Sequence, residues 1–158
     1  MEELKKYLES MNGFYANVIK TKDRQYSSMY DFVLKNGVEC KPQVFPYQKF
    51  ECAPRTKREC FRNAWILAEW FDLIYVEGYA NSIIPVIHAW CVDEELNVYD
   101  PTWDDPEKAS YFGVLFSNRY VGNTIFERCK YGVLDNFEMR YPLLTGIHND
   151  FKYKFKTK

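Results

Sequence analysis

Long hydrophobic runs are missing from this sequence of 158 residues. No apolar stretch approaches the roughly 20 residues that a membrane-spanning helix needs, and the opening MEELKKYLESM lacks the apolar core of a signal peptide. Neither sign of charge is in excess, because 21 basic side chains stand against 22 acidic ones. That balance argues against a nucleic-acid partner held by a basic surface. We therefore expect a cytoplasmic protein that binds neither membrane nor nucleic acid.

Closely spaced cysteine pairs are also missing. The chain has five cysteines, namely Cys40, Cys52, Cys60, Cys91 and Cys129, and no two of them form a CxxC pair. Scattered cysteines of this kind are read as reduced thiols rather than as a disulfide framework. A zinc site that draws on them and on His88 is an alternative, but no close ligand pair marks one. The sequence thus predicts neither a metal site nor another cofactor.

Repeats, low-complexity tracts and linkers are absent as well. A chain of this length suits one domain with one hydrophobic core, and a content of 47% hydrophobic and 18% aromatic residues excludes disorder. We expect a single domain over residues 1–158, with a helical part over about 1–50, a core that carries the chemistry over about 56–125 and a short basic C-terminal tail. The tail, FKYKFKTK, is interpreted as a solvated terminus, although it could touch an acidic surface.

Apolar periodicity predicts two helices in the first part of the chain. The first covers about residues 2–11, where apolar residues recur at three- and four-residue spacing before Asn12-Gly13. The second covers about residues 23–35 and stops at Asn36-Gly37. The following stretch, PQVFPYQKFECAPR, contains three prolines and is expected to be extended or irregular.

The stretch TKRECFRNAWILAEWF combines a helix start with a helical apolar period. Thr56 and Glu59 form a capping-box pattern. One apolar stripe follows, made of Cys60, Ala64, Leu67, Ala68 and Phe71. These features predict a buried helix that carries Cys60 in its first turn.

The position of Cys60 at a helix start favours its thiolate form, because unpaired backbone N–H groups and the positive end of the helix dipole lie there. Arg55, Lys57 and Arg58 add positive charge nearby. The alternative is that Cys60 is simply a small apolar residue on the core face. Cys52 is a rival nucleophile, but no helix pattern follows it.

Three later runs, LIYVEGYA, PVIHAWCVD and NVYDPTW, are short, rich in β-branched or aromatic residues and bounded by turn residues, which predicts strands. Only a few polar residues separate the last two, so we expect an antiparallel hairpin. With the turn centred on Glu94, His88 faces Asp100, and directly opposed Cβ atoms lie about 4.5 to 5.5 Å apart. A slip of one residue would send Asp100 to the other face. The alternative is a surface histidine beside an acidic residue.

A thiol at a helix start, an imidazole on one strand and a carboxylate on the next are the groups that thiol-dependent acyl transfer requires. In this interpretation Cys60 attacks a carbonyl carbon as the thiolate. His88 holds the proton and returns it to the leaving group, and Asp100 orients and stabilises the imidazolium. The separation of the three residues along the chain is no obstacle, because such groups meet only in the fold.

The segments ECFRNAWILA, YVEGYA, HAWCVD and VYDPTW follow one another in that order and resemble the core of the transglutaminase-like superfamily over about residues 56–103. The resemblance implies an α+β, papain-like fold in which a cysteine-bearing helix packs on an antiparallel sheet. It places the nucleophile on Cys60, the base on His88 and the orienting acid on Asp100. The chain lacks the calcium-binding additions of large crosslinking members, and the resemblance leaves out its first fifty residues.

Residues around the expected site have weaker interpretations. Tyr75, Glu77 and Tyr79 share one face of the predicted strand, and Gly78 would allow a backbone or a substrate to approach closely. Glu77 and Tyr79 are candidate substrate-binding residues. The alternative for Glu77 is an edge charge in solvent.

The remaining candidates are aromatic. Trp90 and Trp103 are candidate walls of a substrate cleft, with an aromatic core as the alternative. Cys91 lies three positions after His88, an odd difference, so on a strand it points away from the site. His148, in TGIHND, is interpreted as a loop residue without a role in the site.

Two functions are compatible with these patterns. The first is a thiol-dependent enzyme of the amidase, protease, deamidase or transglutaminase type, whose substrate is a protein, a peptide or a small amide. The second is a catalytically inactive binding or inhibitory protein that keeps the fold and holds a partner in an aromatic-rich cleft. The sequence indicates no oligomeric state.

Overall fold

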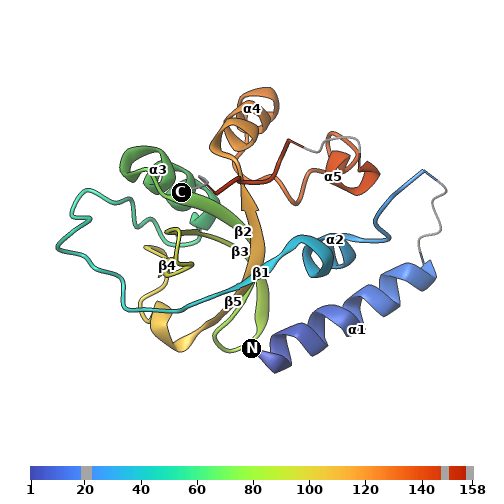
Figure 1. Ribbon diagram of the computed structural model, residues 1–158, viewed down its shortest axis with the longest axis horizontal. Coiled ribbons are helices and arrows are strands. Elements are labelled where there is room, and N and C mark those ends of the chain that lie inside the picture. The colour runs from blue at the N-terminus through green and yellow to red at the C-terminus, as the bar shows by residue number, and fades with distance from the viewer. Residues whose placement is uncertain (19–22, 147–149, 156–158) are drawn as a thin grey trace.

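The computed structural model describes residues 1–18, 23–146 and 150–155. Over these residues the chain forms a five-stranded antiparallel sheet in the order β1-β5-β2-β3-β4, together with helices, which is a mixed α+β fold (Figure 1). The strands are β1 (Val38–Cys40), β2 (Ile74–Asn81), β3 (Pro85–Val92), β4 (Val98–Tyr99) and β5 (Ser110–Phe116). The three strands expected from the sequence are β2, β3 and β4, whereas β1 and β5 have no counterpart among the predicted elements.

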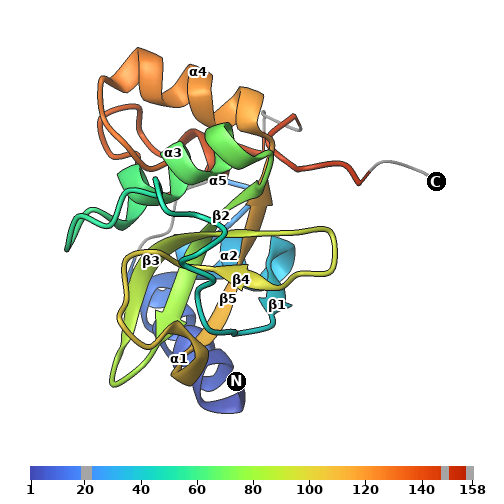
Figure 2. The same cartoon turned by 90° about the vertical axis from the view of Figure 1, so that its left-hand side faces the viewer.

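The five described α-helices pack against one face of the sheet. They are α1 (Glu2–Val18), α2 (Met29–Asn36), α3 (Cys60–Phe71), α4 (Asn118–Arg128) and α5 (Pro142–Thr145), with a short 3-10 helix over Pro106–Lys108. α1 lies near one end, and α3 and α4 lie side by side at the other (Figures 1 and 2). Among the described helices, none has the length and apolar character that crossing a membrane would require.

The two faces of the sheet build two separate apolar clusters, because successive side chains of a strand point to opposite faces. The helix-side cluster packs residues such as Tyr75 and Cys91 against all five α-helices. The inner cluster contains Val76, Trp90 and Tyr111. His88 lies two residues before Trp90 in β3, so its side chain belongs to the inner face.

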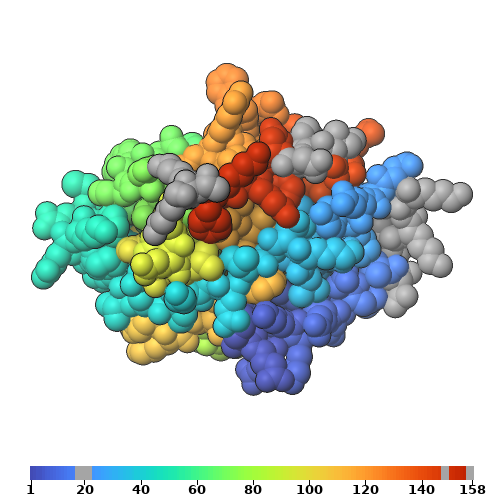
Figure 3. Space-filling model, viewed as in Figure 1, coloured from blue at the N-terminus to red at the C-terminus, as the bar shows by residue number. Residues whose placement is uncertain are grey.

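The sheet is curled, because its two edge strands come together. Lys41, directly after β1, forms a parallel bridge with Asn97, directly before β4. The Lys41 N–H donates to the Leu96 carbonyl at 2.8 Å, and the Lys41 carbonyl accepts from the Val98 N–H at 2.8 Å. The segment after β1 accordingly borders the β3–β4 turn at the surface (Figure 3). This closure encloses the inner cluster.

The first predicted helix is too short. α1 does not end near residue 11 but continues through Gly13 to Val18. Packing accounts for the roughly two extra turns, because the ring of Tyr15 lies 5.5 Å from the ring of Tyr30 in α2, centroid to centroid. Such tertiary contacts override the weak preference of glycine against helix.

Two predicted helix starts are also wrong. α2 begins at Met29 rather than near residue 23, because the Ser28 hydroxyl accepts the Asp31 N–H at 3.0 Å and caps the helix there. α3 begins at Cys60 with Glu59 as N-cap, and no capping side-chain hydrogen bond forms there among the described residues, so the capping box is absent. The predicted end of the second helix and the irregular stretch after Lys41 are confirmed.

Candidate active site

Cys60 is the first residue of α3 and lies in a small pocket with His88. The pocket has a volume of about 280 Å³, and Lys57, Arg58, Thr102, Trp103 and Asp104 line the rest of it. Only 9% of the Cys60 residue is exposed. Because α3 is 12 residues long, its unpaired N-terminal N–H groups and its dipole act on the Cys60 sulfur.

His88 and Asp100 form a buried pair. His88 Nε2 lies 2.7 Å from Asp100 Oδ2, and the two side chains are 3% and 0% exposed. Because Nε2 faces the carboxylate, Nδ1 is the ring nitrogen that remains for Cys60, which lines the same pocket. The structure therefore brings the three residues of the predicted triad together around one imidazole.

The predicted hairpin register is wrong, although the contact that it predicted is present. Cys91 pairs with Tyr99 and Val92 with Val98, so the turn is centred one residue later than Glu94. Extending this register places Asp100 opposite Trp90 and diagonal to His88. The observed register thus moves the partner of Asp100 by two residues, from His88 to Trp90. Residues two apart on a strand lie on the same face, so the side chains of His88 and Asp100 still meet.

Asp93 explains the position of the turn. Its Oδ1 accepts the N–H of Glu95 at 3.0 Å and the N–H of Asn97 at 2.9 Å. Leu96 adopts a left-handed conformation with φ 65°. An aspartate that binds backbone two and four residues ahead closes a local turn, and this turn selects the observed register.

The Asp100 carboxylate is held by three donors among the described residues. Besides His88, Tyr111 Oη donates to Oδ2 at 2.9 Å, and the Thr102 N–H donates to Oδ1 at 2.9 Å. Burial, followed by the Asp100 charge, raises the pKa of Tyr111, so its phenol stays protonated and remains a donor. Tyr111 is a site residue that sequence reasoning misses, because it comes from β5 and reaches Asp100 only through the curl of the sheet.

The electrostatics of the pair favour the imidazolium. Burial alone lowers the pKa of His88, but the Asp100 charge, the hydrogen bond to it and the interaction with Cys60 outweigh burial and raise that pKa to about 9. His88 is therefore protonated at neutral pH. A protonated imidazole beside the Cys60 sulfur is the partner that a thiolate needs.

Asn63 joins the two chain segments that carry the site, and it too escapes sequence reasoning. Its side chain is fully buried in α3. Nδ2 donates to the Thr56 carbonyl at 2.8 Å and to the Thr102 hydroxyl at 3.1 Å. Asn63 thereby links the segment before Cys60 to the segment after Asp100.

The two tryptophans have different positions. Trp103 lines the pocket and stacks on the His88 ring, with centroids 4.3 Å apart and planes at 21°. Trp90 is completely buried in the inner cluster, 6.2 Å from His88 between ring centroids. Trp103 can thus contact a molecule in the pocket, whereas for Trp90 the cleft interpretation is wrong and the core alternative holds.

Glu77 is not a solvent-exposed edge charge, and although it pairs with Ala89, next to His88, its side chain lies on the opposite face of the sheet from the His88 ring. β2 is a central strand, and Glu77 is fully buried on its helix-side face. Its carboxylate accepts the N–H groups of Val133 at 2.7 Å and Leu134 at 3.1 Å, and the Tyr75 hydroxyl at 3.2 Å. Burial raises its pKa and these donors lower it, with a net rise to about 7. Glu77 therefore anchors the segment after α4 and is not placed to bind a substrate of the Cys60 pocket.

Tyr79 lies on the same helix-side face and lines a different cavity, so it too is removed from the His88 pocket. Cys91 also points away, as expected, with its Sγ 3.1 Å from the Ala64 carbonyl. Gly78 permits close approach of a backbone, which is that of β5, since a Cβ there would lie 2.4 Å from Gly113 Cα. His148 lies outside the described residues.

No family model, no curated protein and no solved structure matches the chain. Among the described residues, no three His, Cys, Asp or Glu side chains are grouped to hold a metal ion.

Proposed function

We propose that the protein is a thiol-dependent acyl-transfer enzyme and a small member of the transglutaminase-like superfamily, with a papain-like arrangement of its site. The observation that carries the proposal is the buried His88–Asp100 hydrogen bond of 2.7 Å in the same pocket as a cysteine at a helix N-terminus. The order of the Cys60, His88 and Asp100 segments along the chain supports it.

The reaction begins from the Cys60 thiolate and the His88 imidazolium. The sulfur attacks the carbonyl carbon of an amide and forms a C–S bond, and the carbonyl electron pair moves to oxygen. When this pair returns, the C–N bond breaks, and His88 Nδ1 gives its proton to the leaving nitrogen. The product is a thioester on Cys60 and a free amine. Water or a second amine then attacks the thioester, His88 removes its proton, and the thiolate is regenerated.

Each neighbouring group has a defined task in this reaction. Asp100 holds Nε2–H, which fixes the imidazole and stabilises its positive charge. The N-terminal N–H groups of α3 stabilise the negative oxygen of the tetrahedral intermediate. Arg58 adds positive potential at the pocket, whereas Lys57 is paired with Asp104, Nζ to Oδ2 at 3.9 Å. Trp103, stacked on the imidazole, limits access of water to the pair.

The low exposure of the site favours one alternative, a binding protein that has kept the fold. His88 is only 3% exposed and Cys60 only 9%, which leaves little room for an acyl group unless Trp103 moves. Cys60→Ala distinguishes the two functions. A binding protein keeps its biological effect in this variant, whereas an enzyme loses it while its fold is unchanged.

Competitive alkylation tests the proposal with controls inside the same chain. Cys52 and Cys129 are exposed, and Cys60 is buried. If accessibility alone decided the rate, iodoacetamide would modify Cys60 after both Cys52 and Cys129. We expect Cys60 to react first at pH 7, as measured by mass spectrometry of its peptide, because only the thiolate is nucleophilic and His88 stabilises it.

His88→Gln provides the matched variant. In it Cys60 should react more slowly than Cys52, with circular dichroism unchanged. If wild-type Cys60 reacts no faster than the two exposed cysteines, the proposed activation is wrong. Incubation with p-nitrophenyl acetate adds a second measurement, since a functional nucleophile releases a burst of p-nitrophenolate and leaves an acetyl group on the Cys60 peptide.

A further inference from the structure

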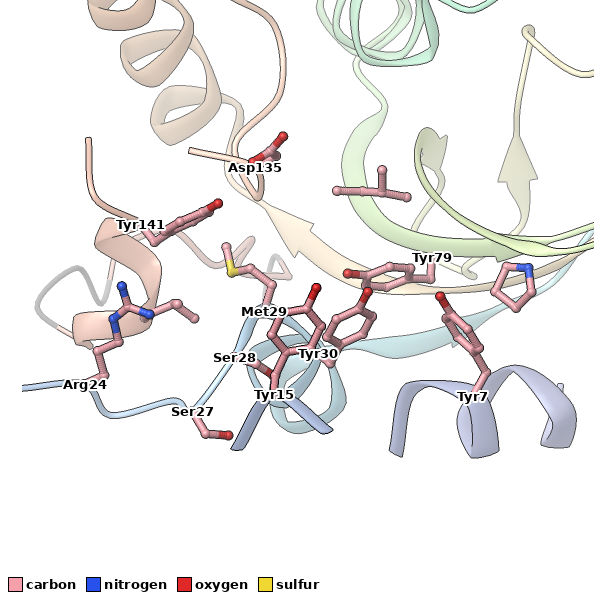
Figure 4. A pocket seen from close by; sticks show the side chains of 13 residues that line it. Tyr7, Tyr15, Arg24, Ser27, Ser28, Met29, Tyr30, Tyr79, Asp135 and Tyr141 are labelled. Carbon is pink, nitrogen blue, oxygen red and sulfur yellow. The ribbon is translucent and has the colours of Figure 1, made fainter. Parts of the chain in front are cut away.

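A second cavity lies on the helix-side face of the sheet (Figure 4). Its volume is about 320 Å³, which is in the range of sites for small organic molecules. Its walls come from α1, α2, β2, β3, α5 and the adjoining segments. Of the described residues, none lines both this cavity and the Cys60 pocket. Ile87 and Tyr79 face it from β3 and β2, on the opposite side of the sheet from His88.

Tyrosine rings form most of the aromatic wall. Tyr30 stacks on Tyr79 with centroids 5.0 Å apart and planes at 20°, and Tyr15 lies 5.5 Å from Tyr30 at 30°. Tyr7 meets Tyr30 edge-on at 6.4 Å. Burial raises the pKa of Tyr30 and of Tyr79, so their phenols stay protonated at neutral pH. Flat rings with hydroxyls at their edges offer stacking area and hydrogen-bonding groups to a planar ligand.

Arg24 is the only cation among the described lining residues. Its guanidinium carbon lies 5.9 Å from the centroid of the Tyr141 ring, and within the described residues no carboxylate comes within 4.0 Å of the guanidinium. Asp135, the acidic lining residue, interacts with the Tyr141 hydroxyl instead. Figure 4 shows Arg24 and Asp135 on different sides of Tyr141.

We infer that this cavity binds a small aromatic acid, with its ring against the tyrosines and its carboxylate on Arg24. A planar guanidinium without an acidic partner matches the geometry of a carboxylate. The apolar lining residues Met29, Pro85, Ile87 and Leu144 exclude water from the bound ring. The inference is independent of the acyl-transfer proposal, since the two sites share no described residue.

Calorimetric titration with 3-(4-hydroxyphenyl)propionate tests the inference, with tyramine as a probe of similar size and opposite charge. We expect the acid to bind and tyramine to bind at least about ten-fold more weakly. Arg24→Gln should weaken binding of the acid by about ten-fold or more, the effect of losing one charged hydrogen-bond partner. Arg119→Gln, at an exposed arginine of α4, is the matched control and should leave the affinity unchanged.

Ile87→Phe tests the location of the site. Ile87 is 37% exposed, so the strand can accommodate a larger side chain at this position. The phenylalanine ring would occupy space in the cavity that Ile87 lines. This variant should lose binding of the acid and keep the alkylation rate of Cys60. The inference is overturned if the acid does not bind at millimolar concentration, if tyramine binds equally well, or if Arg24→Gln and Arg119→Gln have the same effect.

Discussion

Asp100→Asn should abolish the positive charge of His88 at neutral pH. The substitution keeps the size of a fully buried side chain that accepts hydrogen bonds from His88, Thr102 and Tyr111. It removes the negative charge that opposes the effect of burial on the imidazole. The pKa of His88 should therefore fall from about 9 to below its ordinary value of 6.5.

The magnitude follows from these two values. The difference between 6.5 and about 9 corresponds to about 3 kcal/mol of preferential stabilisation of the imidazolium, at about 1.4 kcal/mol per pKa unit. Because the pKa of folded His88 lies above the unfolded value, this contribution is fully present below pH 6.5 and is lost as the pH rises through about 9. The free energy of unfolding of the wild type should decline across this window, and that decline should be largely absent in Asp100→Asn.

Nuclear magnetic resonance of the imidazole nitrogens measures the titration directly. The chain has only two histidines, so a His148→Gln background leaves His88 as a single signal. Tyr111→Phe is the control, because it removes one donor to Asp100 but leaves the carboxylate charge, and its midpoint should remain above 6.5. The reasoning is refuted if wild-type His88 titrates near 6.5, or if Asp100→Asn leaves the midpoint near 9.

Further predictions concern positions outside the pair. Glu77→Gln should remove a second pH dependence of the unfolding free energy. Because the pKa of Glu77 is raised from 4.5 to about 7, the stability that this carboxyl contributes is present below pH 4.5 and is lost as the pH rises through about 7. Urea unfolding at several pH values measures this loss in the wild type and its absence in the variant. Gly78→Ala should destabilise the protein by roughly 1–3 kcal/mol in thermal melts, because a Cβ there meets Gly113 Cα at 2.4 Å. Gly13→Ala is its counterpart in α1, where a Cβ meets no described atom within 4 Å, and should stabilise by up to about 1 kcal/mol. Asn63→Ala should cost about 1–3 kcal/mol of unfolding free energy and slow Cys60 alkylation, and an unchanged rate would contradict the positioning role of Asn63.

Local patterns in the sequence were sufficient to locate the central elements of the site. The apolar stripe from Cys60 to Phe71 predicts a helix, and the structure has α3 over those residues. β-branched and aromatic runs bounded by turn residues predict β2 and β3, and the two-residue repeat of a strand separates the face of His88 from that of Cys91. These predictions succeed because helix and strand periodicity depend on neighbouring residues along the chain.

Contacts between distant segments decided the rest. Glu77 has the sequence environment of an exposed strand residue, yet it is buried because strands on both sides enclose β2 and the N–H groups of Val133 and Leu134 reach its carboxylate. Tyr111 approaches Asp100 only because the sheet curls. Neither the burial of Glu77 nor the contact of Tyr111 with Asp100 produces a periodic pattern in the sequence, because each depends on how elements far apart in the chain pack together.

The sequence by itself determined which residues could supply a thiol, an imidazole and a carboxylate, and that His88 and Cys91 lie on opposite faces of β3. Only the tertiary structure decided the register of the hairpin, in which Asp100 lies opposite Trp90 rather than opposite His88. The same structure brings His88 Nε2 to 2.7 Å from Asp100 Oδ2. The physical reason is that side-chain direction repeats every two residues in a strand, whereas register depends on turn contacts such as those of Asp93 and on the closure of the whole sheet.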